Sequence, residues 1–187
     1  MIRSKQDYIE FTQVERGKGG GATLREMLFP SPAGQFIRAL RTLEYHYNCH
    51  HKIRTLISYY CWWRLMRVTG ISIAKNVCEK GLTIPHHGAI VVNSACHIGE
   101  NCMIMNNVNI GANGGSLKAP QIGSDVYIGP GAVIFGDIEI ADGCYIGANA
   151  VVNKSFLVPN SVIAGVPAKV INTDPVHWWE KNGLPRE

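Results

Sequence analysis

The chain has 187 residues, enough for one sizeable domain and a smaller appended segment. Its net charge of +4 comes from residues 1–68, which hold eleven Lys and Arg against five acidic residues. Residues 69–187 are slightly acidic, so we expect no nucleic-acid groove on them. No apolar run reaches the roughly 18 residues of a membrane-spanning helix, and no signal peptide is recognisable. We therefore expect a cytoplasmic protein.

Residues 1–68 are expected to form an N-terminal helical segment. The polar stretch 1–22 ends in a glycine-rich run, which is typical of a linker, and a short helix is expected over 23–29. From Pro32 to Val68 apolar residues recur at intervals of three and four. The spacing predicts two helices with a break near Asn48.

Two groups of residues in this segment allow more than one interpretation. His46 and His50 have the spacing of metal ligands on a helix, but no further ligand is identifiable, so we expect a surface or packing role. The stretch 59–67 is aromatic and basic, and such a helix can lie on a membrane surface. We favour its packing against the end of the next domain, where it would cover an open core, and treat peripheral membrane contact as the alternative.

From Ile98 to Val170 the sequence repeats every six residues. Eleven of the thirteen first positions are Ile or Val, the next position is often Gly, and the fifth is small or apolar. The first positions are Ile98, Ile104, Ile110, Ser116, Ile122, Ile128, Ile134, Ile140, Ile146, Val152, Val158, Ala164 and Val170. A six-residue period is typical of a parallel β-helix, in which the branched side chain points inward and stacks on its equivalents. The following Gly is expected to supply dihedrals that other residues adopt only with strain.

Four of the six cysteines fall in the same repeat phase. Cys96, Cys102 and Cys144 take the fifth position, and Cys78 fits the phase extended upstream. In such places Cys acts as a small buried apolar residue. We expect reduced, structural thiols.

The repeat becomes irregular in two places. Between Ile73 and Ile98 the phase slips, and projecting the later phase backwards places His86 inward and His87 outward. The second irregularity is the loop 112–120, which is rich in Gly and contains Pro. In a regular prism, irregular segments are where function is expected.

Several stretches resemble the hexapeptide-repeat acyltransferases. Those that resemble the family in general are 128–132 (IGPGA), 146–152 (IGANAVV) and 164–169 (AGVPAK). The stretch 81–88 (GLTIPHHG) resembles the serine acetyltransferase branch.

This resemblance implies a mainly β fold. Residues 69–172 would form a left-handed parallel β-helix after the N-terminal helical segment, and residues 173–187 a C-terminal tail with a short helix. It also implies a homotrimer, with a dimer of trimers as a further possibility if the N-terminal helices pair.

The resemblance also assigns the chemistry. His87 matches the catalytic general base, and His86 stands where the family usually has an orienting Asp. Acetyl-CoA is the implied co-substrate, and no metal is expected. Its binding residues would be Gly111, Gly129, Ala148, Asn153, Lys154 and Lys169. The oxyanion donor stays open among Gly111, Gly129 and Gly131, since Pro130 has no N–H.

The acceptor is the least determined part of the function. Serine acetyltransferases carry Arg-His before the Pro of the mid-domain loop, whereas this chain has Lys118 and Ala119 before Pro120. We therefore expect an O-acetyltransferase acting on a sugar of a surface polysaccharide or its precursor, with Lys118 binding the substrate. The alternatives are a serine O-acetyltransferase and, more remotely, a non-catalytic trimeric scaffold. A zinc hydrolase of the gamma carbonic anhydrase type is disfavoured, because no histidine follows His97 until His177.

Overall fold

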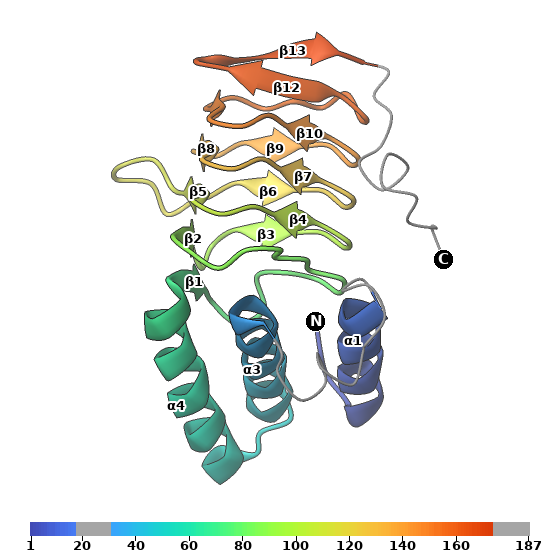
Figure 1. Ribbon diagram of the computed structural model, residues 1–187, viewed down its shortest axis with the longest axis vertical. Helices are drawn as coiled ribbons and strands as arrows, with labels where there is room; N and C mark the ends of the chain where they lie inside the picture. Colours follow the sequence, from blue (N-terminus) through green and yellow to red (C-terminus); the bar gives the residue numbers. More distant parts are fainter. Residues whose placement is uncertain (18–30, 174–187) are drawn as a thin grey trace.

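The computed structural model describes residues 1–17 and 31–173, which form three helices and a stack of β-coils (Figure 1). The helices are α1 (Lys5–Gly17), α3 (Pro32–Asn48) and α4 (Lys52–Thr69). The two helices predicted on either side of Asn48 are present, whereas α1 was not predicted from its polar sequence. The expected helices over 23–29 and in the tail after residue 173 lie outside the described residues.

Thirteen short strands follow. They are β1 (Ile71–Ile73), β2 (Ile90–Val92), β3 (His97–Ile98), β4 (Met103–Ile104), β5 (Asn109–Gly111), β6 (Gln121–Ile122), β7 (Tyr127–Ile128), β8 (Val133–Phe135), β9 (Glu139–Ile140), β10 (Tyr145–Ile146), β11 (Val151–Val152), β12 (Val162–Gly165) and β13 (Ala168–Asn172). They make three sheets, ordered β1-β2-β5-β8-β11, β13-β12-β10-β7-β4 and β3-β6-β9. All pairs are parallel except β12 with β13. The architecture is a three-sided parallel β-helix, as the six-residue period predicted.

The register shows how long each coil is. Val91 pairs with Asn109, and Val133 pairs with Val151, so each of these coils takes 18 residues. Asn109 pairs with Val133, so the coil between them takes 24. The extra hexapeptide leaves the stack as the loop 112–120, which projects from the β-helix after β5 (Figure 1).

The core consists mainly of the inward aliphatic side chains of the repeat. The predicted inward positions from Ile98 to Val152 are buried, apart from Ser116 in the projecting loop. The prediction is wrong for the last repeats, because Val158 is exposed and Ile163 takes the inward place. The reason is a shorter final coil, in which Tyr145 pairs with Val162 after 17 residues.

The repeat glycines serve close packing between coils rather than unusual dihedrals, so that expectation was mostly wrong. Among the glycines that follow a first position, only Gly165 has a positive φ. A Cβ added to Gly99 would lie 2.6 Å from the carbonyl carbon of Gly123, and one on Gly129 would lie 2.7 Å from the oxygen of Ile146. Positive φ occurs instead at turn positions, several of them Asn or Asp. These are Asn76, Asn101, Asn107, Asp125, Asn149 and Asn160.

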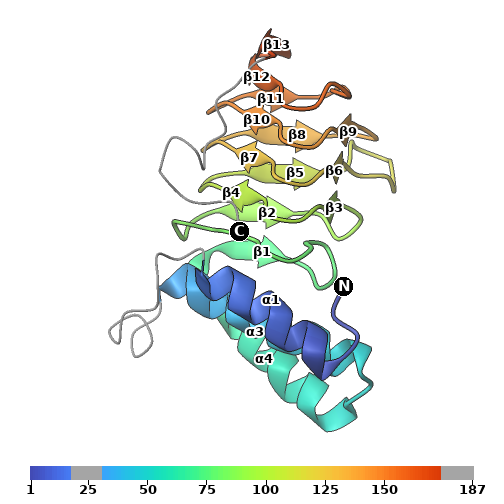
Figure 2. The same cartoon turned by 90° about the vertical axis from the view of Figure 1, so that its right-hand side faces the viewer.

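The open end of the β-helix is covered mainly by α3. Its residues Phe36 and Leu40 are fully buried and belong to the same apolar cluster as the first coils. The prediction that 59–67 covers this end holds only in part, because Trp62 and Leu65 pack on the cluster while Tyr60 points to solvent. Helix α3 lies between α1 and α4 (Figures 1 and 2).

A buried arginine joins the helices to the first coil. Arg41 is fully buried on α3, and its guanidinium donates hydrogen bonds to Glu15 of α1 and to Glu44 one turn further along α3. It also donates to the carbonyl oxygens of Cys78 and Glu79. Burial acts to lower the pKa of Arg41, but the carboxylates of Glu44 and Glu15 outweigh it and raise the pKa, so the charge is retained. This network fixes how the helices sit on the β-helix.

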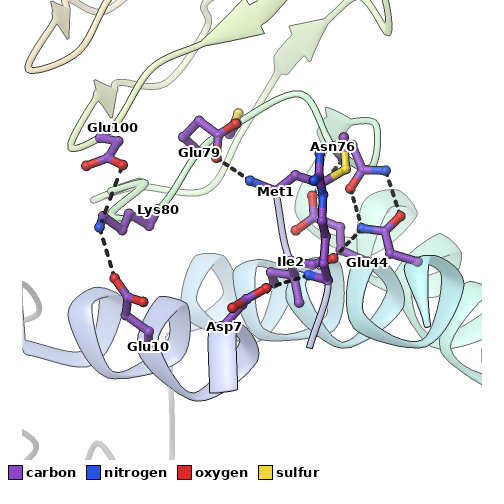
Figure 3. A network of polar contacts seen from close by, with 12 residues as sticks. Met1, Ile2, Asp7, Glu10, Glu44, Asn76, Glu79, Lys80 and Glu100 are labelled. Atoms are coloured by element: carbon purple, nitrogen blue, oxygen red, sulfur yellow. Dashed lines mark hydrogen bonds and ion pairs between the residues drawn. The ribbon is translucent and has the colours of Figure 1, made fainter. Parts of the chain in front are cut away.

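More exposed polar contacts surround the same junction (Figure 3). Lys80 bridges Glu10 of α1 and Glu100 of the second coil, with nitrogen–oxygen distances of 2.9 and 3.7 Å. The Asn48 and Asn76 amides exchange hydrogen bonds of 2.9 and 3.0 Å. These contacts add specificity to the docking, since exposed ion pairs contribute little stability.

The thiols of the β-helix are buried, as predicted. All six cysteines are free, and Cys78, Cys96, Cys102 and Cys144 are buried. Burial raises the pKa of Cys96 to about 11. Such thiols behave as small apolar core residues.

The packing of the glycine column can be tested by substitution. We expect Gly99→Ala to lower the free energy of unfolding by roughly 1–3 kcal/mol, because the added methyl group overlaps the backbone of the next coil. The measurement is urea denaturation followed by circular dichroism. Gly114→Ala is the matched control, since a Cβ there meets nothing within 4 Å. Equal effects of the two substitutions would contradict the packing role.

Candidate active site

The two candidate catalytic histidines lie on a bend that leaves the first coil. Inward residues Ile84 and Val92 are eight positions apart, whereas the equivalent pair in the next coil, Ile104 and Ile110, is six apart. The two extra residues push the bend outward, so that His86 and His87 are both exposed. The prediction that His86 points inward is therefore wrong, because the repeat phase does not extend back across this bend.

The backbone after the histidines is anchored to the end of α4. Gly88 has φ 146°, in a region that favours glycine, and its N–H donates a 3.0 Å hydrogen bond to the carbonyl of Thr69. The N–H of Ile90 donates to the carbonyl of Gly70 at 3.1 Å. These two hydrogen bonds hold the backbone that directly follows His87 against the end of α4.

The bend forms the first level of one edge of the prism. This histidine edge comprises the successive corners 85–89, 105–108, 129–132 and 147–150, which all connect the β4-β7-β10 sheet to the β2-β5-β8-β11 sheet. Hydrogen bonds connect successive corners. The N–H of Gly131 donates to the backbone carbonyl of Asn106, and the N–H of Asn149 donates to the carbonyl of Pro130. Gly129 and exposed Ala148 thus lie on the same edge as His87, on the third and fourth levels.

Most of the other predicted site residues lie on a different edge of the prism. The loop edge comprises the corners 93–96, 112–120, 136–138 and 153–155, on the other side of the β2-β5-β8-β11 sheet. It holds Lys118, Asn153 and Lys154, all exposed, and it begins at Gly111. Within one chain these residues are separated from His87 by a sheet whose strands span roughly 10 Å.

The charged candidates at the loop edge and the far end have identifiable neighbours. Lys118 Nζ lies 2.6 Å from a carboxylate oxygen of Asp137, and this hydrogen bond raises the pKa of Lys118. Lys154 Nζ lies 5.6 Å from the centre of the Phe156 ring. Lys169 is exposed on the terminal strand β13. Each of the three ammonium groups faces solvent and can meet an anionic group.

Two of the three proposed oxyanion donors are already engaged. The N–H of Gly129 donates to the carbonyl of Ile146 at 2.8 Å, and that of Gly131 donates to Asn106 at 3.1 Å. Both bonds belong to the ladder between coils, so these amides are not free to bind an oxyanion. Gly111 lies opposite Phe135 in the β5–β8 ladder, so it is no better placed than the other two, and the oxyanion donor stays a prediction.

Asn106 was not predicted from the sequence as a site residue. It lies on the histidine edge in the next coil, one level above the bend that carries His87. A Cβ on Gly88 would be 3.6 Å from the Cβ of Asn106, so the asparagine side chain flanks the bend. Asn107 beside it has φ 60° and forms the corner. The available signal was the Asn-Asn pair at a corner where later coils carry Gly and Pro.

The other histidines do not join this site. His97 is exposed on β3, which belongs to the β3-β6-β9 sheet. The corner that carries His87 connects the other two sheets. On the helices, the Nδ1 atoms of His46 and His51 are 3.1 Å apart, and burial lowers the pKa of His46. Across residues 1–17 and 31–173, no three metal-ligating side chains lie close enough together to hold an ion.

Comparison with known proteins identifies the repeat. Residues 119–154 match the model of the bacterial transferase hexapeptide family (six repeats). Among curated proteins, the serine acetyltransferase of Mycobacterium tuberculosis is 36% identical over 107 residues, which cover 56% of this chain and 46% of the relative. A serine acetyltransferase of Staphylococcus aureus is 37% identical over 112 residues, covering 58% and 52%. The chain spans about half the length of these relatives.

Solved structures agree with the sequence comparison. Serine acetyltransferase from Brucella abortus superimposes with a TM-score of 0.73 at 25% identity, covering 89% of this chain and 70% of that one. A Neisseria gonorrhoeae serine acetyltransferase solved in complex with serine gives a TM-score of 0.69 at 26% identity, covering 88% and 69%. The chain carries the hexapeptide repeat over residues 119–154 and is similar to the serine acetyltransferases in sequence and in fold. The resemblance seen in its sequence motifs is confirmed.

The same comparisons correct the expected acceptor. The sequence favoured a sugar because Lys118 and Ala119 replace the usual Arg-His, yet the relatives at 36–37% identity and the solved neighbours are serine acetyltransferases. The loss of two side chains from a projecting loop was too weak a basis for assigning another substrate.

Proposed function

We propose that this protein is an acetyl-CoA-dependent serine O-acetyltransferase. The observation that carries the proposal is the exposed His87, held on a fixed bend at the edge that also carries Gly129 and Ala148, in a chain similar to serine acetyltransferases. A related Brucella abortus enzyme has been solved in complex with coenzyme A, which supports the choice of acyl donor.

His87 acts as the general base in this proposal. A ring nitrogen of its neutral imidazole accepts the proton of the serine hydroxyl while the oxygen forms a bond to the acetyl carbonyl carbon. The carbon–sulfur bond then breaks, and the imidazolium returns the proton to the sulfur of CoA. The products are O-acetylserine and the free thiol. Imidazole suits this double role because its pKa lies near the working pH.

The remaining candidates would bind acetyl-CoA and the acceptor. Gly129 and Ala148 provide a narrow surface without long side chains along the histidine edge, where the pantetheine arm would lie. Lys154 and Lys169 would meet phosphates, and Asn153 would hydrogen-bond to the donor. Lys118, whose side chain is exposed on the loop 112–120, would lie near the acceptor.

Assembly explains how two separate edges could serve one site. We propose a left-handed β-helix that forms a closed homotrimer, in which the histidine edge of one copy faces the loop edge of the next. Residues 118 and 153–154 of the neighbouring copy would then approach His87. The proposal is supported by the division of the candidates between two edges of one chain and by the fold shared with serine acetyltransferases.

The role of His87 predicts a specific pattern of mutant kinetics. His87→Asn should lower kcat by roughly 10²–10⁴-fold, the usual contribution of general-base catalysis. CoA affinity measured by calorimetry and the oligomeric state measured by light scattering should be almost unchanged, because Asn keeps polarity and the bend is fixed by Gly88.

His86→Asn is the matched control for this substitution, since both side chains are exposed on the same bend. We expect it to lower kcat much less than His87→Asn. An inactive His86→Asn enzyme beside an active His87→Asn enzyme would reverse the assignment, and two active variants would place the base elsewhere.

The acceptor can be tested by following thiol release from acetyl-CoA. L-serine should be acetylated in a saturable manner, with a higher kcat/KM than amino sugars and oligosaccharides, and O-acetylserine should be identified by mass spectrometry. Preference for any saccharide over serine would contradict the proposal. Absence of transfer to every acceptor, with CoA still bound, would instead indicate a non-catalytic scaffold.

A further inference from the structure

Helix α4 has an outward face that nothing in the described chain covers. Its inner side packs on α3 and on the first coil, where only Ser58 and Thr69 are fully buried and Trp62 and Leu65 are partly buried. The opposite side exposes large apolar residues. These are Ile53 (75% exposed), Leu56 (73%), Ile57 (60%), Tyr59 (51%), Tyr60 (58%), Trp63 (36%) and Val68 (75%).

Ile53, Leu56, Ile57, Tyr60 and Trp63 form an apolar stripe on one face of the helix, and Tyr59 and Val68 lie at its two margins. At 100° per residue, Ile53, Ile57 and Tyr60 lie on adjacent turns of one helix face, and Leu56 and Trp63 lie beside them. The Tyr60 and Trp63 rings stack with their centres 6.1 Å apart. Figure 1 shows α4 on the side of α3 that is opposite to α1, so one long side of α4 faces away from the other two helices. An apolar stripe of this kind on the surface marks an interaction site.

The charge on α4 has one sign only. The helix sequence KIRTLISYYCWWRLMRVT contains four basic residues and no acidic one. Lys52 and Arg54 lie on either side of the stripe at its start, whereas Arg64 and Arg67 continue the same face in the last two turns of the helix. The Arg67 guanidinium lies 4.8 Å from the centre of the Trp63 ring, so its charge sits beside the aromatic group.

A groove continues this surface between α3 and α4. It has a volume of about 450 Å³, and its lining includes Arg38, Arg54 and Ile57. Its lining is mixed, and it places Arg38 and Arg54 beside Ala39 and Ile57. Cations next to hydrocarbon suit a phospholipid, which joins an anionic phosphodiester to acyl chains.

We propose that α4 docks on an anionic lipid membrane surface, with its apolar stripe in the interface and its basic residues on acidic headgroups. Apolar and aromatic side chains combined with cations are the features of helices that lie in the membrane plane. The helix binds without crossing the bilayer, since no helix within residues 1–17 and 31–173 is long and apolar enough to span one.

A second copy of the chain fits this face less well. Symmetric pairing through α4 would place Lys52, Arg54, Arg64 and Arg67 of both copies together, with no acidic residue on the helix to neutralise them. The nearby Glu44 of α3 is buried and already paired with Arg41. Like charges at an isologous interface oppose association.

The test uses the whole protein and sedimentation with vesicles. We expect it to sediment with phosphatidylcholine vesicles that contain phosphatidylglycerol and to stay in solution with pure phosphatidylcholine. Raising the salt concentration should weaken the association. The double variant R64E/R67E should lower the partition coefficient by about tenfold or more, as expected from roughly 1 kcal/mol per basic residue near an anionic surface.

Two further variants separate the alternatives. I53S/I57S should also lower binding by about tenfold, because it removes apolar area without changing charge. R3E/K5E is the matched control, since it makes the same change in net charge at exposed positions at the start of the chain, and it should bind as the unmodified protein does. Circular dichroism melting curves establish that each variant is folded.

Three results would overturn the proposal. The first is no binding to anionic vesicles at low salt, and the second is an equal loss of binding in R3E/K5E. The third is light scattering in which I53S/I57S halves the oligomer while vesicle binding is absent, which would assign the stripe to a second copy. Acetyl transfer is measured separately, so failure here leaves the proposed reaction untouched.

Discussion

The structure depends on the stacking of inward aliphatic side chains from coil to coil. Each strand contributes only two to five residues, so no strand is stable alone, and the buried column supplies the cohesion. Hydrogen bonds between strands set the distance between coils, so a Cβ at Gly99, Gly123 or Gly129 would overlap the next coil. Because stacking fixes the corners, the edges of the prism become rigid rows on which residues from distant parts of the sequence meet.

The candidate site lies along one of these rows and includes a corner whose spacing departs from the six-residue repeat. Two extra residues between Ile84 and Val92 make the bend that exposes the histidines, while the corners that follow keep regular spacing. The bend is held by the end of α4, and α3 is held in turn by Arg41, which binds α1 and the carbonyls of the first coil. The N-terminal helices are therefore part of the support for His87.

The sequence was informative where the period was regular. The inward positions from Ile98 to Val152, the buried cysteines and the projecting loop all followed from the six-residue phase. The prediction was wrong where coils differ in length. A constant six-residue phase projected across those coils placed His86 inward and Val158 in the core. Arg41 could not be anticipated, because its partners come from α1, α3 and two backbone carbonyls that only the fold brings together. Asn106 was overlooked for the same reason, since its nearness to Gly88 depends on how the coils stack.

The central claim is that the histidine edge is where acyl transfer takes place. The most direct test is a crystal structure of the protein with CoA bound. The account predicts that the CoA sulfur lies within hydrogen-bond reach of an imidazole nitrogen of His87, at roughly 3–3.5 Å. It also predicts that the pantetheine arm runs past Gly129 and Ala148. A CoA molecule bound with its thiol on another edge, out of reach of His87, would contradict the account.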